Sequence, residues 1–599
     1  MTSRRQALAG MAGAAWMWSA AMPNAASAAS DRATARSLVD RMTLEEKVGQ
    51  LFMIEVAGQD AFRVSEAAAA LNRRRYGVAT PAEVLRKYAP GGVIYFSARG
   101  DDNLASPRQI ARLSDGLQRA SRSATGLPLI ISVDQEGGAV SRMPTPPATP
   151  QPGNMALGAT WSPSDARRSY EITGAELHAC GITADHAPVA DVNVNPANPV
   201  IGVRSFGASP QAVSTFVQAA IKGLHRGGVA VTAKHFPGHG DTDTDSHFGL
   251  PRITHSRSQL DAIDLPPFRA AVAAGVDLIM TAHISVPALD PTLVPATMSH
   301  AVVTGLLREE LGFDGLIVTD ALDIQGASKQ FPPDKAAVTA LAAGVDMLVL
   351  SPDLPLAHAA VVDAVRSGRI SASRLDASVV RILSHKIRRG LFTDVLGDGF
   401  EDRAERVVGR PEFRSDVVAI TARSTTLVKN DNGALPIRTG ARGVLVTGSD
   451  SVAVSRLAAS FTSRGHAVTS LDAGATPDRG RIDEVVAAAA AADLVVVATS
   501  GLTVGGGKDA GVAQVGLVRA LLAAKTRVVV VGVRTPYDIN RFPDAPVYLA
   551  TYGNGADALD HAVQVIVGEH GPSGRLPVSI PVAGDPSQTL FPIGHGLRY

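Results

Sequence analysis

Eight short apolar runs between residues 49 and 350, separated by segments with helical periodicity, constrain this 599-residue chain more than any other feature. Parallel strands that are covered on both faces have this signature, because neither face carries polar side chains to solvent. The runs lie at 49–56, 92–96, 129–133, 182–188, 229–233, 278–282, 315–319 and 347–350. Eight such strands alternating with helices predict a closed (β/α)₈ barrel.

Polar residues follow these runs at the points where such a barrel places its chemistry, the C-terminal ends of the strands. Asp134 follows the third run, and Lys234 and His235 follow the fifth. His283 follows the sixth run, and Asp320 follows the seventh. We therefore expect these side chains to meet at one mouth of the barrel.

The pattern changes after residue 381, and a second unit of α/β type follows a segment rich in charge and glycine. Its apolar runs at 443–447, 494–499, 527–533 and 547–551 alternate with helical segments, which is typical of an open doubly wound sheet. The predicted fold class is therefore α/β. It comprises a (β/α)₈ TIM barrel over 29–395, a linker over 396–412 and a C-terminal α/β sandwich domain over 413–599.

The N-terminus has the features of an export signal. Arg4 and Arg5 precede a moderately apolar stretch over 7–22, and Ala26-Ser27-Ala28 fits the small-x-small cleavage pattern. The paired arginines favour the twin-arginine route. We expect residues 1–28 to be a signal peptide and the mature protein to lie in the periplasm, the cell wall or the extracellular space. No later segment has the length and apolar purity of a membrane span.

Composition excludes some classes of partner. A net charge of +1 with 19% charged residues gives no support for binding to nucleic acid or to a membrane surface. The single cysteine, Cys180, has no partner for an internal disulfide, so packing alone must hold the fold. We expect a monomer.

The densest polar segment is the loop over 234–247, which contains three histidines after Lys234 and three alternating aspartates. A calcium loop is disfavoured, because Ser246 and Arg252 stand where glycine and glutamate are needed. A transition-metal site and a purely structural loop remain open. Acid–base catalysis is the favoured interpretation, because Asp245 lies two residues before His247 and can orient its ring and raise its basicity.

Two carboxylates next to predicted strands have alternative explanations. Asp320 at the end of an apolar strand is costly to bury without a partner or a role, although it can also cap the next helix. Asp134 precedes a glycine-rich turn and can bind the hydroxyl groups of a ligand or simply close its loop.

Together these segments resemble glycoside hydrolase family 3, and within it the β-N-acetylhexosaminidases. The family pattern KHFPGHGxTxxDSH is matched over 234–247, VDQEGG over 133–138, RSFG over 204–207 and TDAL over 319–322. The resemblance continues in the second unit at 423–430, 573–577 and 591–597, so it covers essentially the whole mature chain.

This resemblance implies a role for each matched residue. Asp320 would attack the anomeric carbon, His247 would protonate the leaving oxygen and later deprotonate water, and Asp245 would orient His247. The sugar hydroxyls would be bound by Asp134, Arg142, Arg204, Lys234 and His235. His283 would either contribute to this subsite or be a buried core histidine. No metal and no cofactor are implied.

The predicted activity is that of a retaining β-N-acetylglucosaminidase, which releases non-reducing-end GlcNAc from muropeptides or chitin oligosaccharides. The alternatives are a β-glucosidase or a GlcNAc phosphorylase of the same family, or a non-catalytic cell-wall-binding protein. Ala139, Val203 and the polar pair Asp185-His186 depart from the family pattern and put the aglycone side in doubt. The second unit has a packing or wall-facing role by default.

Overall fold

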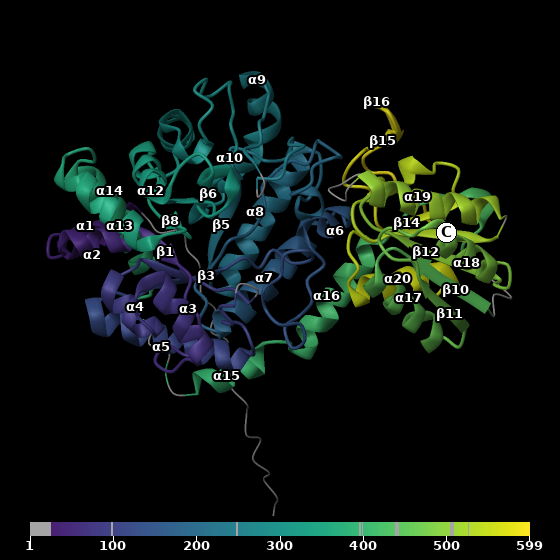
Figure 1. Cartoon of the computed structure of the whole chain (residues 1–599), viewed down its shortest axis with the longest axis horizontal. Helices are drawn as coiled ribbons and strands as arrows, with labels where there is room; N and C mark the ends of the chain where they lie inside the picture. The colour runs from purple at the N-terminus through teal and green to yellow at the C-terminus, as the bar shows by residue number, and fades with distance from the viewer. Residues whose placement is uncertain are drawn as a thin grey trace, which may run out of the picture.

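A computed structural model describes residues 25–97, 100–246, 249–393, 397, 399–437, 443–502, 508–524 and 526–599. Figure 1 shows two lobes, a larger one that contains β1 to β8 and a smaller one that contains β9 to β16. The predicted residues His247 and Arg4–Arg5 lie outside the described ranges.

The larger lobe is built on eight parallel strands in the order β7-β6-β5-β4-β3-β2-β1-β8. A parallel bridge between Val318 and Met347 joins β7 to the start of β8 and closes the barrel. The predicted (β/α)₈ barrel is therefore confirmed. Its strands are β1 (Phe52–Ile54), β2 (Gly92–Ile94), β3 (Ile130–Val133), β4 (Ala184–Asp185), β5 (Ala230–Phe236), β6 (Leu278–Thr281), β7 (Leu316–Thr319) and β8 (Leu348–Val349).

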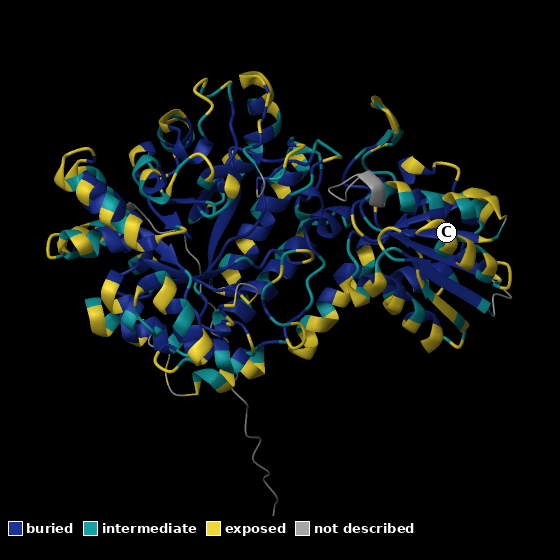
Figure 2. Cartoon of the chain, viewed as in Figure 1, coloured by how far each residue is buried: buried dark blue, intermediate teal, exposed yellow. Residues whose placement is uncertain are grey.

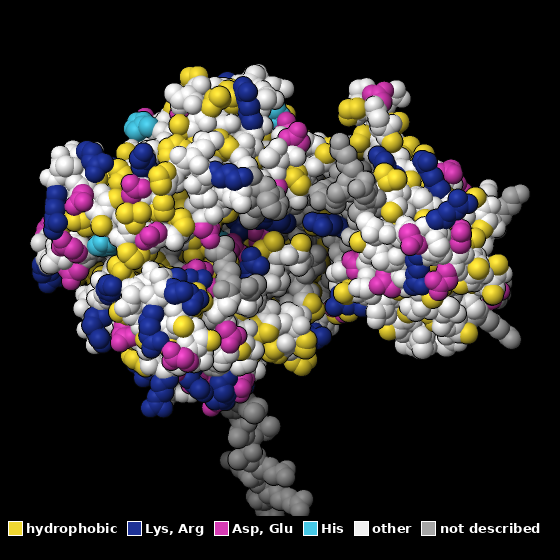
Figure 3. All heavy atoms as spheres, viewed as in Figure 1, with side chains coloured by type: hydrophobic (Ala, Val, Ile, Leu, Met, Phe, Trp, Pro, Cys, Tyr) yellow, Lys and Arg dark blue, Asp and Glu magenta, His cyan; other side chains and the backbone are white. Residues whose placement is uncertain are grey.

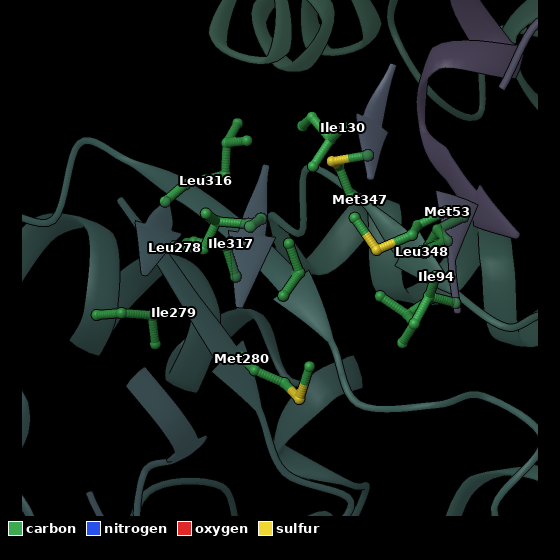
Figure 4. Packing of buried hydrophobic residues seen from close by; sticks show 14 of the residues in the cluster. Met53, Ile94, Ile130, Leu278, Ile279, Met280, Leu316, Ile317, Met347 and Leu348 are labelled. Atoms are coloured by element: carbon green, nitrogen blue, oxygen red, sulfur yellow. The ribbon is translucent and has the colours of Figure 1, made fainter. Parts of the chain in front are cut away.

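The barrel strands are buried along their whole length, which explains why most of their residues are apolar. Figure 4 shows Met53, Ile94, Ile130, Met280 and Met347 among the side chains that pack around the strands. Figure 2 shows the complementary pattern, with exposed residues concentrated on the outer helices.

Helices cover the outside of the barrel. Two of them, α7 and α8, pack closely because glycines line their contact, and a Cβ on Gly227 would lie 2.5 Å from the Cα of Gly174. The helical segments of this lobe are α1 (Ala25–Val39), α2 (Leu44–Gln50), α3 (Glu66–Tyr76), α4 (Pro81–Tyr88), α5 (Pro107–Thr125), α6 (Asn154–Ala159), α7 (Pro163–Ala179), α8 (Pro210–Gly227), α9 (Arg257–Gln259), α10 (Pro266–Ala273), η4 (Ala301–Glu310), α11 (Gln325–Ser328), α12 (Pro333–Ala343), α13 (Leu354–Arg366) and α14 (Ala372–Arg388).

Within the predicted linker, Phe400–Val407 form helix α15, which packs against α5. Arg108 of α5 forms ion pairs with Glu401 and Glu405, and Ala404 is part of the barrel core. These contacts with a distant helix give the segment structure that its charged composition did not indicate. Helix α16 (Pro411–Ser424) then leads to the smaller lobe.

The smaller lobe contains a six-stranded sheet in the order β11-β10-β12-β13-β14-β9, parallel except for β9. Side chains alternate along β12, with Val495 and Val497 in one core cluster and Leu494 and Val496 in another. Each face of the sheet therefore has its own core, as a doubly wound sandwich requires. The elements are β9 (Thr426–Asn430), β10 (Gly443–Gly448), α17 (Ser451–Ser463), β11 (Ala467–Asp472), α18 (Arg479–Ala489), β12 (Leu494–Thr499), α19 (Lys508–Ala523), β13 (Val528–Gly532), η6 (Pro536–Arg541), β14 (Val547–Ala550), α20 (Ala556–Val567), β15 (Ile580–Val582) and β16 (Asp585–Phe591).

The described chain begins in α1, which packs along α14, and the predicted cleavage motif Ala26-Ser27-Ala28 lies in its first turn. Among the residues that the structure describes, none of the helices has the length and apolar character that crossing a bilayer requires.

Candidate active site

The predicted polar side chains gather at the C-terminal ends of the barrel strands. Strand β5 extends beyond the predicted run, so Lys234 and His235 lie within the strand, close to its C-terminal end. Asp134 directly follows β3, and Asp320 directly follows β7. Figure 3 shows that the surface between the two lobes is hollowed and that Lys and Arg side chains gather there.

Lys234 is the centre of a buried charge network. Its Nζ lies 2.7 Å from Asp134 Oδ1 and 2.7 Å from Glu136 Oε1. Arg204 donates two hydrogen bonds of 2.8 Å to the two carboxylate oxygens of Glu136. Glu136 therefore joins the two cations, Lys234 also contacts Asp134, and Asp134 and Arg204 are the half-buried members of the network.

The two carboxylates stay ionised in this network. Burial alone would raise the pKa of Glu136, but Arg204 and Lys234 lower it to about 2. Burial likewise opposes ionisation of Asp134, and Lys234 and His186 hold its pKa well below the ordinary range. The network thus presents fixed charges and hydrogen-bonding groups, which suits recognition of hydroxyl groups.

His235 is oriented by a buried aspartate. Its Nδ1 lies 2.7 Å from Asp191 Oδ2, and its backbone N–H and that of His239 donate to Asp191 Oδ1 at 3.2 and 2.7 Å. Since a carboxylate accepts from Nδ1–H, the other ring nitrogen, Nε2, is the acceptor and faces Arg204 Nη2 at 3.3 Å. The ring is thereby held between the charge network and the loop that follows β5.

Asp320 has the properties of an ionised, partly accessible carboxylate. Its Oδ1 accepts a hydrogen bond of 2.7 Å from the N–H of Ala321, and its backbone N–H donates to Thr281 on the neighbouring strand. Burial favours the neutral acid, but His235, His283 and the Ala321 amide together lower the pKa of Asp320 below the ordinary value. A carboxylate that is ionised at neutral pH is the form that a nucleophile needs.

His283 is completely buried behind Asp320, and both of its ring nitrogens contact protein groups. Nε2 donates to the carbonyl of Ala321 at 3.0 Å, and Nδ1 lies 3.0 Å from Thr297 Oγ1. Burial lowers its pKa, so the neutral ring predominates. Of the two roles left open by the sequence, these contacts favour the core histidine, which supports the turn that carries Asp320.

The first half of the loop after β5 is firmly anchored. The ring of His239 contacts Thr242 at 2.9 Å, and Asn198 donates to the carbonyl of His239 at 2.9 Å. Asp241 Oδ2 lies 3.0 Å from Nε2 of His255, whose other nitrogen contacts Asp264 at 2.7 Å.

The described residues on either side of His247 meet the segment that follows Asp320. The N–H of Gly326 in α11 donates to the carbonyl of Ser246 at 2.9 Å. A Cβ on Gly326 would lie 3.1 Å from the carbonyl oxygens of Ser246 and Gly249. Asp245 is half-buried, and its carbonyl accepts from Gly249 at 3.2 Å. The fifth-strand loop and the seventh-strand turn are therefore direct neighbours.

Arg142 lies on the loop after β3, with its guanidinium stacked 5.7 Å from the Phe96 ring centre. Its backbone N–H donates to Gln135 at 2.7 Å, whereas its buried Nε has no hydrogen-bond partner among the described residues. A buried donor without a partner is costly, so Arg142 is suited to bind a ligand.

Glu136 and Asp191 were not among the predicted site residues, although both hold predicted residues in place. Glu136 stands inside the VDQEGG segment, which was the available signal. The unusual pair Asp185-His186 lies deeper, where His186 contacts Ser132 and Thr232 at 3.0 and 3.1 Å. Burial lowers the pKa of His186 to about 4, so the neutral ring belongs to a polar layer beneath the site.

Comparisons with known proteins agree with this geometry. The model of the glycosyl hydrolase family 3 N-terminal domain matches residues 43–385, and that of the C-terminal domain matches residues 425–599. Beta-hexosaminidase A of Pseudoalteromonas piscicida is 34% identical over 83% of this chain and 90% of its own length. A Cellulomonas fimi protein named beta-N-acetylglucosaminidase/beta-glucosidase is 34% identical over 53% of this chain and 57% of its own.

A similar solved structure is that of a glycoside hydrolase family 3 β-N-acetylglucosaminidase from Paenibacillus sp. str. FPU-7. It is 35% identical, with a TM-score of 0.79 over 90% of this chain and 100% of that chain. Both lobes of the present structure therefore have counterparts in that enzyme.

Proposed function

Because the chain belongs to glycosyl hydrolase family 3, we propose that it is a retaining β-N-acetylglucosaminidase. Its substrates would be peptidoglycan fragments or chitin oligosaccharides, from which it releases the non-reducing-end GlcNAc. The observation that carries the proposal is the meeting of the Asp320 turn with the loop that contains the Asp245–His247 dyad, through Gly326 and Ser246. The names of the relatives from Pseudoalteromonas and Paenibacillus support the choice of sugar.

In the proposed reaction, the Asp320 carboxylate attacks the anomeric carbon while His247, oriented by Asp245, protonates the leaving oxygen. The glycosyl ester on Asp320 is then hydrolysed by water that His247 deprotonates. The lowered pKa of Asp320 supports the first step, because the attacking group must be ionised before the bond to the leaving group breaks.

The charge network would form the subsite for GlcNAc. Asp134 and Lys234 present a carboxylate and an ammonium at the mouth, and Arg204 and His235 border them. Arg142 adds a guanidinium whose Nε has no partner among the described groups. Hydroxyl groups both donate and accept, so a set that mixes anions and cations can satisfy several of them at once.

A β-glucosidase is the second candidate, because the name of the Cellulomonas relative joins both activities. Hydrolysis of 4-nitrophenyl β-N-acetylglucosaminide and of the matching glucoside separates the two. We expect a preference for the first substrate and a loss of at least about 10³-fold in kcat for Asp320→Ala and for His247→Ala. Preference for the glucoside, or unchanged rates in both variants, would defeat the proposal.

The stereochemistry gives an independent check. A retaining enzyme releases the β-anomer of GlcNAc first, which proton NMR of the early reaction detects before mutarotation. Azide added to Asp320→Ala should yield the α-glycosyl azide, because the anion then attacks the face that the carboxylate has left.

Export by the twin-arginine route is also proposed, on the basis of Arg4, Arg5 and the following apolar stretch. Replacement of both arginines by lysine should retain the precursor in the cytoplasm. Export of that variant at the wild-type level would contradict the proposed route.

A further inference from the structure

The short turn η1 (Gly202–Arg204) is a point at which the candidate sugar site and the smaller lobe contact the same segment. Arg204 extends from this turn to bind both oxygens of Glu136. Its own carbonyl accepts a hydrogen bond of 2.7 Å from Asn154 of α6. The position of the turn therefore determines where the Arg204 guanidinium lies in the charge network.

Asn193 holds the other end of this turn. Its Oδ1 accepts a hydrogen bond of 3.1 Å from the N–H of Gly202, and its Nδ2 donates to the hydroxyl of Tyr537 at 3.1 Å. Asn193 and Tyr537 are each only 1% exposed. Without the Tyr537 hydroxyl, the buried Nδ2 of Asn193 would lose the acceptor of its hydrogen bond, which is costly. The orientation of Asn193 therefore depends on Tyr537.

Tyr537 belongs to the smaller lobe, in η6, and it lies in a core cluster with residues of the barrel. Thr535 lies beside the turn, since a Cβ on Gly202 would be 3.5 Å from its methyl group. One core cluster contains Tyr537 together with Met155 of α6 and Val203 of η1. Figure 1 shows α6 on the side of the barrel that faces the smaller lobe. The two lobes thus share a packed core directly behind Arg204.

We propose that Tyr537 is a positioning residue for the sugar subsite: through Asn193 it fixes the η1 turn, and the turn holds Arg204 on Glu136 and beside Lys234. The inference rests on the proposed function and extends it by giving the smaller lobe a part in substrate binding. Tyr537 itself does not touch the substrate. Its loss should weaken binding of the sugar while leaving Asp320 and the acid–base loop in place.

The test compares two buried tyrosines of the smaller lobe. Tyr537→Phe removes the hydroxyl that contacts Asn193. Tyr552→Phe removes a hydroxyl whose hydrogen-bond partner, Thr426 at 2.8 Å, lies within the same lobe. Both lose one buried hydrogen bond, so thermal unfolding should show similar decreases in stability. Only Tyr537→Phe should raise KM for the nitrophenyl substrate, by about three- to tenfold. Its kcat should stay within about twofold of the wild-type value.

A double-mutant cycle separates positioning from general destabilisation. Asn193→Ala should raise KM at least as much as Tyr537→Phe, because the turn then loses its contact with Gly202 as well. In the Asn193→Ala background, Tyr537→Phe should have no further effect on KM. Equal KM values for Tyr537→Phe and Tyr552→Phe, or additive effects in the cycle, would overturn the inference.

Failure of the proposed function has a different signature. If the wild-type protein hydrolyses only the glucoside, the proposed sugar is wrong, and the same cycle is measured with the glucoside. The Tyr537 inference then stands or falls on the KM ratios for that substrate.

Discussion

Glu136 offers the most demanding test of the charge network, because one side chain holds two cations. In Glu136→Gln the shape is kept, but Lys234 and Arg204 lose the negative charge that they share at 2.7 and 2.8 Å. Glu136 is 3% exposed as a whole residue, so water cannot replace the lost partner. Asp134 is then the remaining carboxylate that contacts Lys234.

The expected cost follows from the burial. Removal of one partner of a buried ion pair costs about 3–5 kcal/mol, because the other charge stays desolvated. With an unfolding entropy of about 2.1 cal/mol/K per residue, a barrel of roughly 350 residues loses about 4–7 °C in Tm. The KM for the nitrophenyl substrate should rise at least about tenfold, since Lys234 and Arg204 both lose their alignment.

The effect should depend on pH in a defined direction. The pKa of Glu136 is lowered to about 2 in the folded state, so its stabilisation is present above the unfolded value of about 4.3. That stabilisation is lost as the pH falls from about 4 towards 2. The difference in unfolding free energy between wild type and Glu136→Gln should therefore be full at pH 7 and shrink across that acid range.

Glu66→Gln is the matched control. Glu66 also contacts an arginine, Arg73, at 2.7 Å, but its side chain is 82% exposed. Its removal should cost less than about 1 kcal/mol and leave KM unchanged. If Glu136→Gln unfolded within 1 °C of wild type and kept its KM, the reasoning about the shared buried charge would be refuted.

Three further predictions concern other parts of the molecule. Gly326→Ala should lower kcat about two- to tenfold with little change in Tm, because its Cβ crowds the carbonyls beside His247; wild-type kcat would contradict this. The hydrogen bond that His255 donates to the Asp264 carboxylate raises the pKa of His255, so the stability difference between wild type and His255→Gln should be largest below pH ~6.5. This difference should shrink as the pH rises through the pKa of His255 in the folded protein. A difference that grew over that range would contradict the prediction. EDTA should leave the rate of hydrolysis unchanged, and loss of activity restored by a divalent ion would indicate a metal site.

Much of the barrel was predictable from local sequence. A strand buried on both faces is mostly apolar, so all eight barrel strands were recognisable without knowledge of their neighbours. The same logic located β10, β12, β13 and β14 in the smaller lobe. It missed β11, whose residues are largely exposed or half-buried at the sheet edge, and β9, which pairs antiparallel with β14. Their strand conformation depends on partners that are distant in the chain.

The candidate site divides in the same way. Asp134, Lys234 and Asp320 were predictable, because a residue that follows a barrel strand has its position set by that strand. Outside the site, helix α15 was not predictable, because its structure depends on its packing and ion pairs with the distant helix α5.

By itself, the sequence determined which elements form and which polar residues stand at their ends, because burial and periodicity act over a few neighbouring residues. Only the tertiary structure decided that Glu136 bridges Lys234 and Arg204, that Asp191 orients His235, and that Tyr537 of the smaller lobe contacts Asn193. These partners are separated by dozens to hundreds of residues in the chain. Their contacts depend on how whole elements pack, and no local pattern encodes that packing.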